Sequence, residues 1–202
     1  MLDMKGADTV LDTIKNRRSI RDYQDKDLPV EAIHEIIDAG IQAPSGVNLQ
    51  PWRFVVITDR EVIQRISDYC KPILAKDLEA VEREESKAFI DALMSEDFSI
   101  FYNAPVLILV LGNQRDPMHA IDCTLCAENM MLAAWSLGIG SCWIGSATVM
   151  QRSPEMLSLL QIPEGFDIVS PLIFGYPAFV PEKVGRCEAA ITWVPSQGES
   201  QG

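Results

Sequence analysis

The most informative part of this sequence is RRSIRDY, residues 17–23. Within five positions it places three guanidinium groups and one hydroxyl, at Arg17, Arg18, Ser19 and Arg21. A guanidinium group offers several N–H donors in a fixed plane, which suits phosphates and carbonyl-rich rings. Taken alone, the cluster could also be the solvated end of a helix, where the helix dipole favours cations. The sequence that follows decides between these two interpretations.

A second polar segment, APSGVNLQPW at residues 43–52, comes soon after the first and leads into an apolar stretch. It delivers Ser45, Asn48 and Gln50 in a turn-rich setting. These residues are ordinary turn formers, but their hydroxyl and amide groups can also satisfy the donors and acceptors of a heterocycle. Together, the two segments predict the two halves of a site for an anionic, aromatic cofactor.

The overall charge makes the arginine cluster a local exception. The chain has 202 residues, of which 17 are Lys or Arg and 29 are Asp or Glu, giving a formal net charge of -12. Nucleic acids and anionic membrane surfaces both need a broad basic face. We therefore expect neither as a partner, and a small anionic ligand fits the cluster better.

Several features indicate a cytoplasmic protein. The N-terminal stretch MLDMKGADTV has acids and no apolar core of signal-peptide length. The longest uninterrupted apolar run, residues 104–112, is too short to cross a bilayer. Five cysteines form no dense framework, as expected for free thiols in a reducing compartment.

Hydrophobic spacing predicts interleaved helices and strands without an internal repeat or linker. Helices are expected at residues 8–16, with Asp8 as N-cap, from about 27–29 to 41, within 59–97, and at 121–137 and 154–160, the last capped by Ser153. Strands are expected at residues 53–58, 105–111, 141–144, 168–174 and 187–194. This pattern predicts one α+β domain over residues 1–195, and a disordered tail at 196–202.

Four landmarks in order make the chain resemble the nitroreductase family of FMN-dependent oxidoreductases. They are the two segments already quoted, the stretch NMMLAAWSLGIGSCWIG at residues 129–145, and the turn GYP at residues 175–177, which is followed by basic positions. The resemblance implies a central mixed β-sheet flanked by helices, an intertwined homodimer with FMN at the subunit interface, and a variable helical cover over the active site at residues 59–102.

The resemblance also implies a role for particular residues. Arg17 would contact the FMN phosphate, Arg18 and Ser19 would lie along the ribityl chain and pyrimidine edge, and Arg21 would lie near flavin N1 and O2. Ile144 and Gly145 match the backbone segment that faces flavin N5 and O4. The remaining candidates are the partner-subunit contacts Pro44, Ser45, Gly46 and Asn48, and the basic pair Lys183 and Arg186 near the phosphate.

The function implied by the resemblance is a ping-pong transfer of reducing equivalents from NADH or NADPH through FMN to a nitroaromatic, a quinone or a related conjugated electrophile. Flavin carries this chemistry itself, so no catalytic acid–base pair is expected. Alternatives are a reductive dehalogenase or another specialised reaction on the same scaffold, and a non-catalytic flavin-binding, storage or redox-sensing protein.

Other motifs carry less chemistry. The pair Cys123 and Cys126 lies in an expected helix without a second pair at zinc spacing, so we interpret it as buried thiols and expect no metal site. The glycines of residues 138–145 do not match a dinucleotide fingerprint, and they follow a helix where that fingerprint follows a strand. Neither His34 nor His119 has a recognisable nucleophile beside it, which makes a cysteine-nucleophile enzyme improbable.

Overall fold

The computed structural model describes residues 10–80 and 87–194, and within them the α+β class is confirmed. The helices are α1 (Val10–Asn16), α2 (Val30–Gly40), α3 (Arg60–Glu79), α4 (Lys87–Leu93), α5 (His119–Ser136) and α6 (Pro154–Leu159), with 3-10 turns η1 (Gly46–Asn48) and η3 (Gly145–Arg152). The strands are β1 (Trp52–Ile57), β2 (Val106–Asn113), β3 (Gly140–Trp143) and β4 (Phe166–Gly175).

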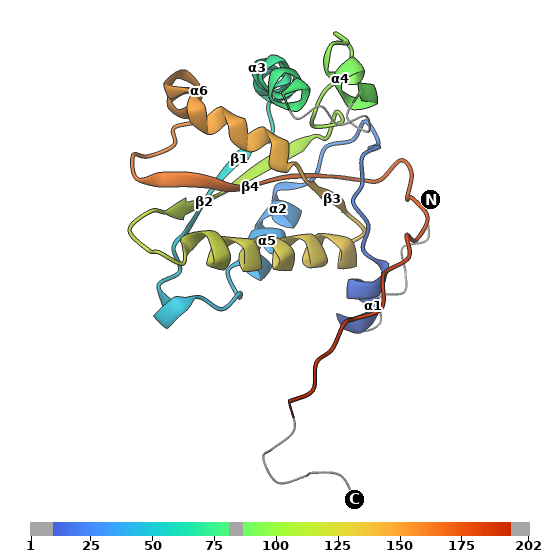
Figure 1. Ribbon diagram of the computed structural model, residues 1–202, viewed down its shortest axis with the longest axis vertical. Helices are drawn as coiled ribbons and strands as arrows, with labels where there is room; N and C mark the ends of the chain where they lie inside the picture. The colour runs from blue at the N-terminus through green and yellow to red at the C-terminus, as the bar shows by residue number, and fades with distance from the viewer. Residues whose placement is uncertain (1–9, 81–86, 195–202) are drawn as a thin grey trace, which may run out of the picture.

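A four-stranded sheet in the order β1-β2-β4-β3 divides the molecule into two layers. Helices α3, α4 and α6 cover one face, while α2 and α5 cover the other (Figure 1). Strand β2 is buried on both sides, because Leu107, Leu109 and Leu111 enter the first core and their alternating neighbours enter the second. This explains why its sequence is continuously apolar and does not alternate.

The sheet differs from the expected mixed sheet, because all pairs of neighbouring strands in it are antiparallel. Strand β2 runs opposite to β1, and β4 runs opposite to both of its neighbours, β2 and β3. In the described ranges, parallel pairing is limited to an isolated bridge between Ser19 and Ser141. The mixed character is therefore corrected for the four strands of one chain.

Most predicted elements are confirmed with small shifts at their ends, and Ser153 caps α6 by accepting a hydrogen bond from the Met156 N–H. The predicted strand at 187–194 is wrong, because residues 181–194 form neither helix nor strand in this chain. Its β-branched residues favour a strand, but the segment is exposed and pairs with no strand among the described residues. The Asp8 cap and the tail at 196–202 lie outside the described residues.

Helix α5 is the central element of the second layer. It approaches α2 so closely that a Cβ added at Gly40 would lie 2.6 Å from Met130 Cγ. Its other side is less covered, because Ile121 and Leu125 remain 54% and 42% exposed. Helix α5 is covered by α2 and by the sheet, and the exposed Ile121 and Leu125 are apolar residues on the part that neither covers.

Candidate functional site

A cleft of about 510 Å³ forms where the first polar segment meets the C-terminal arm, defined here as residues 177–194. Its lining contains six basic residues and one acidic residue: Lys15, Arg17, Arg18, Arg21, Lys183, Arg186 and Glu182. The structure therefore brings together the predicted Arg17, Arg18, Ser19, Arg21, Lys183 and Arg186, which come from opposite ends of the sequence. This concentration of positive charge contrasts with the net charge of -12 for the whole chain.

The first segment is held in an extended form by the edge of the sheet. The Ile20 N–H donates to the Ser141 carbonyl over 2.9 Å, and the Ile20 side chain is fully buried. Further along, the Tyr23 hydroxyl donates to the Ile20 carbonyl over 2.7 Å. With Ile20 anchored in the interior, alternation along the extended backbone leaves Arg21 exposed.

Two arginine nitrogens in the cleft lack a hydrogen-bond acceptor. The Nε atoms of Arg17 and Arg18 are buried and have no hydrogen-bond partner among residues 10–80 and 87–194. Arg17 Nε lies 3.5 Å from Glu128 Oε1, close enough for an ion pair but without hydrogen-bond geometry. A buried cationic donor without an acceptor is costly, so these residues fit an anionic group with several oxygen acceptors, such as a phosphate.

Arg21 lies against the aromatic ring of Tyr102, the last residue of the expected helical cover at 59–102. Its guanidinium carbon is 5.9 Å from the centroid of the Tyr102 ring, within cation–π range. Burial raises the pKa of the Tyr102 hydroxyl, and the positive charge of Arg21 opposes that rise. Tyr102 has a φ of 52°, an uncommon backbone conformation for an aromatic residue. Tyr102 thus limits the directions in which Arg21 can point.

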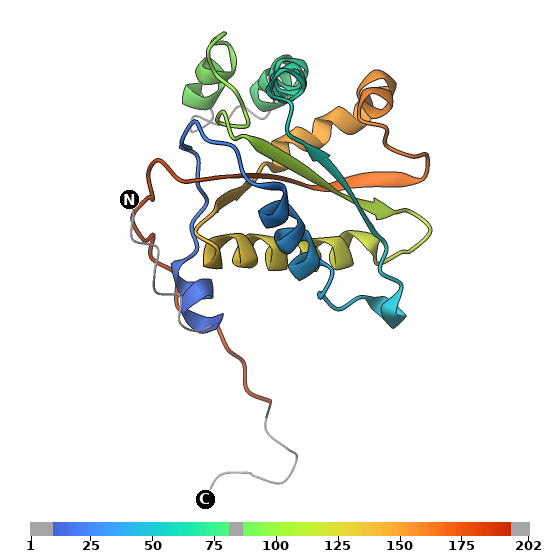
Figure 2. The same cartoon turned by 180° about the vertical axis from the view of Figure 1, so that it is seen from behind.

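The second polar segment lies elsewhere in the chain's own fold. Pro44, Ser45, Gly46 and Asn48 do not line the cleft, and η1 lies at the opposite end of α5 from α1 in both views (Figures 1 and 2). Helix α5 has 18 residues and so extends about 27 Å. One small cofactor cannot contact both segments of the same chain, but a cofactor shared between two copies could.

The segment is nevertheless well organised. The Ser45 hydroxyl accepts from the Gln50 N–H over 3.0 Å, and the Gln50 amide donates to Asn48 Oδ1 over 3.2 Å. From outside the segment, the buried Asp122 accepts a hydrogen bond from the Gly46 N–H over 3.0 Å. Sequence reasoning missed Asp122, although a lone acid in the first turn of a mostly apolar helix was a usable signal.

The predicted Ile144 and Gly145 also lie outside the cleft lining. Ile144 follows β3, is 6% exposed, and donates its N–H to the Pro171 carbonyl over 2.9 Å. Gly145 is exposed and begins η3. A Cβ added at Gly145 would meet its nearest neighbour, Trp143 Nε1, at 3.6 Å, so a ligand could approach this backbone closely.

The cysteines and histidines form no metal centre. The described residues contain no group of three or more His, Cys, Asp or Glu side chains able to hold a metal ion. Burial raises the pKa of the Cys123 and Cys126 thiols to about 12, so both are protonated near neutral pH. His34 is exposed on α2.

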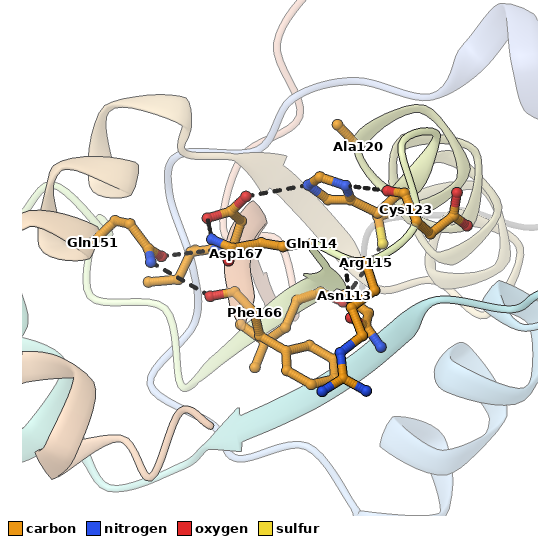
Figure 3. A network of polar contacts seen from close by, with 12 residues as sticks. Asn113, Gln114, Arg115, Ala120, Cys123, Gln151, Phe166 and Asp167 are labelled. Atoms are coloured by element: carbon orange, nitrogen blue, oxygen red, sulfur yellow. Dashed lines mark hydrogen bonds and ion pairs between the residues drawn. The ribbon is translucent and has the colours of Figure 1, made fainter. Parts of the chain in front are cut away.

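His119 instead joins the start of α5 to the sheet. Its Nε2 lies 3.2 Å from Asp167 Oδ2, and its Nδ1 lies 2.6 Å from the Asp116 carbonyl oxygen. Asp167 also accepts a 2.7 Å hydrogen bond from the Gln114 amide, and this network ties β4 to the turn after β2 (Figure 3). The described helices include none long and apolar enough to span a membrane.

Comparison with known proteins places this geometry in a family. A sequence model of the Nitroreductase family matches residues 14–176. A protein of Methanothermobacter thermautotrophicus, named provisionally as an NADH dehydrogenase/NAD(P)H nitroreductase, is 33% identical over 84% of this chain and 78% of its own length.

Solved structures agree with this assignment. The nitroreductase of Bacteroides fragilis, crystallised with bound FMN, is 30% identical, has a TM-score of 0.78, and aligns over 92% of this chain and 98% of its own. An oxidised iodotyrosine deiodinase, bound to FMN and 3-iodo-L-tyrosine, is 25% identical with a TM-score of 0.76, over 93% and 100% of the two chains. With the family model covering most of its length and the fold shared throughout, the chain belongs to the nitroreductase family.

Proposed function

We propose that this protein is an FMN-dependent oxidoreductase that takes reducing equivalents from NADH or NADPH and passes them to a conjugated organic electrophile. The observation that carries the proposal is the basic cleft, in which the buried Nε atoms of two arginines have no hydrogen-bond acceptor among the described residues. Its residues fit a phosphate, and FMN ends in one. The FMN-bound nitroreductase and the FMN-bound iodotyrosine deiodinase support the same cofactor.

Bound FMN would supply the hydride and electron chemistry, and the chain's own residues would bind and orient it. Arg17 and Arg18 offer donors to the phosphate, and Lys183 and Arg186 add charge from the C-terminal arm. Arg21, held against Tyr102, would stabilise negative charge on the reduced ring. Ile144 and Gly145 would contribute backbone groups to the ring edge.

We propose further that the working unit is a homodimer with two shared sites. The second segment is too far from the cleft to reach the same cofactor within one chain, and both segments carry exposed polar groups suited to a ligand. A second copy would also cover apolar side chains that are exposed on α1, the second segment, α5 and the C-terminal arm, which are Val10, Leu11, Ile14, Val47, Leu49, Ile121, Leu125, Ile191 and Trp193.

The proposed cycle is ping-pong: the nicotinamide donor leaves before the acceptor binds. Nitroaromatics and quinones are the first acceptors to test. Reductive dehalogenation is a second candidate, favoured by the iodotyrosine deiodinase relative, whose structure contains a halogenated tyrosine. Residues 59–102, which include α3 and α4, are the proposed cover that would select among these acceptors.

Anaerobic reduction tests the proposal. Protein reconstituted with FMN is mixed with NADH or NADPH, and flavin absorbance near 450 nm is followed, with roughly equimolar donor expected to bleach it. Bleaching followed by reoxidation on addition of a nitroaromatic, a quinone or 3-iodotyrosine identifies the acceptor class. Bound flavin that neither donor bleaches would instead indicate a storage or sensing protein, and failure to bind FMN would overturn the proposal.

A further inference from the structure

The backbone of the second polar segment is strained. Val47, Asn48 and Gln50 have φ values of 43°, 59° and 49°, in the left-handed region that side chains with a Cβ rarely adopt. A β-branched residue such as Val47 is especially unfavourable there, and its side chain is 91% exposed, so local packing does not hold it. Such strain persists only when surrounding contacts determine the conformation.

Most of the segment's hydrogen bonds do not connect it to the rest of the protein. Between residues 45 and 50, the Ser45, Gly46, Asn48, Leu49 and Gln50 bonds close the loop on itself. Among the hydrogen bonds of the described residues, the link from residues 44–50 to the protein body is the one from the Gly46 N–H to Asp122 Oδ2. The shape of the loop is therefore set internally, but its placement depends on Asp122.

Asp122 is suited to hold the loop because it stands on a fixed support. It is 4% exposed and lies in the first turn of α5, where the helix dipole favours a carboxylate. The start of this helix is joined to the sheet through His119 and Asp167, and Asp167 in turn binds Gln114 (Figure 3). Asp116, in the turn just before the same helix, accepts a hydrogen bond from the Met118 N–H over 2.8 Å.

From this geometry we propose that Asp122 is a positioning residue that fixes the 45–48 loop for contact with the cofactor of the neighbouring subunit. The role rests on the proposed function, because the loop contacts a cofactor only if FMN is bound between two copies. Asp122 itself would touch no cofactor. It would act through the Gly46 N–H and so through the placement of Ser45 and Asn48.

The first test compares FMN dissociation constants with thermal stability in four proteins. Asp122→Ala removes the acceptor and is expected to weaken FMN binding about tenfold or more, since the lost hydrogen bond is charge-assisted. Asp122→Asn retains an oxygen that can accept from Gly46 and should restore most of the affinity. Asp116→Ala is the matched control, because it removes a buried carboxylate from the same helix start without touching the loop. It should lower the melting temperature, because the Met118 N–H loses its acceptor, but leave FMN affinity within about twofold.

A second variant removes the donor and does not disturb the core. Gly46→Pro deletes the N–H at a half-buried turn, and the preceding Ser45, with a φ of -140° and a ψ of 153°, already has a backbone compatible with a following proline. It should weaken FMN binding as Asp122→Ala does, and the double variant should be no worse than either single one. Additive losses would mean that the two residues act separately and would overturn the proposal.

Amide hydrogen exchange in the protein without FMN separates a specific effect of Asp122 on the loop from a general loss of stability at the start of α5. Asp122→Ala should accelerate exchange at Gly46 and its neighbours, and Asp116→Ala should not. Normal FMN affinity in folded Asp122→Ala, or equal loss in Asp116→Ala, would overturn the positioning role. If the wild-type protein binds no FMN, the proposed function falls and this role falls with it, whatever the exchange rates show about the tether.

Discussion

Removing the Arg17 side chain should weaken FMN binding while leaving riboflavin binding nearly unchanged. The side chain is 23% exposed and its Nε lacks a hydrogen-bond acceptor, so it is available to the phosphate in a partly dry cleft. One charge-assisted hydrogen bond contributes about 1.5–3 kcal/mol. At about 1.4 kcal/mol for each tenfold change, Arg17→Ala should raise the FMN dissociation constant by about 10- to 100-fold.

The neighbouring carboxylate strengthens this expectation. Glu128 pairs with Arg17 at 3.5 Å, and without Arg17 its negative charge would repel the phosphate. Loss of the ion pair itself should cost little folding stability, since the Glu128 side chain is 44% exposed and such pairs contribute about 0–1 kcal/mol. The change should therefore appear in ligand affinity and hardly at all in the melting temperature.

The assay is quenching of flavin fluorescence at fixed ionic strength, with FMN and riboflavin titrated in parallel. Riboflavin lacks the phosphate and so isolates the contact assigned to Arg17. Arg65→Ala is the matched variant, because it removes an arginine whose surface ion pair with Glu155 spans 3.4 Å outside the cleft. Equal loss of riboflavin affinity in Arg17→Ala, or unchanged FMN affinity, would refute the phosphate role.

Two further predictions concern charge and protonation. Arg21→Ala should lower the two-electron reduction potential of bound flavin by about 20 mV, since an exposed charge at contact distance contributes about 1 kcal/mol. Spectroelectrochemistry measures this potential, and an unchanged value would contradict the placement of Arg21 beside the flavin ring. Burial raises the pKa of three thiols to about 12, so at pH 8 alkylation of the folded protein should label Cys187 and leave activity intact. Above pH 9 the unfolded thiols lose protons that the folded ones keep, so the free energy of unfolding should fall up to pH 12, by about 1.4 kcal/mol per pH unit for each thiol. An alkaline denaturation series without that slope, or inactivation by alkylation at pH 8, would contradict this reasoning. The three thiols whose pKa is raised to about 12 are Cys70, Cys123 and Cys126.

Local sequence patterns predicted the helices and strands that depend mainly on their own residues. The continuous apolar run of β2 indicated a strand buried on both faces, and Ser153 indicated the start of α6. The strand expected at 187–194 shows the limit of such reasoning, because a β-branched stretch becomes a strand only beside an available sheet edge. Propensity alone does not say whether that edge exists in the same chain.

The candidate site was predictable where it follows from a compact motif. Arg17, Arg18 and Arg21 lie in one cleft with Lys183 and Arg186 of the C-terminal arm, a grouping that the family resemblance implied; their contacts with FMN stay a prediction. The sequence marks Asp122 as an unusual acid in a mostly apolar helix, but not its hydrogen bond with Gly46, which lies 76 residues away and depends on how α5 packs beside the loop. Likewise, the contact between Arg21 and the Tyr102 ring arises from tertiary packing, so local sequence patterns did not predict it.

The central claim, that each cofactor site combines two chains, is tested most directly by subunit complementation. Arg17→Ala disables the cleft, and the double variant Ser45→Ala, Asn48→Ala disables the loop. Each homodimer should bind FMN poorly. A heterodimer purified through two different affinity tags should regain one tight FMN site per dimer, because one site then receives an intact cleft from one chain and an intact loop from the other. If cleft and loop of the same chain formed each site, both sites of the heterodimer would be impaired and no tight binding would return.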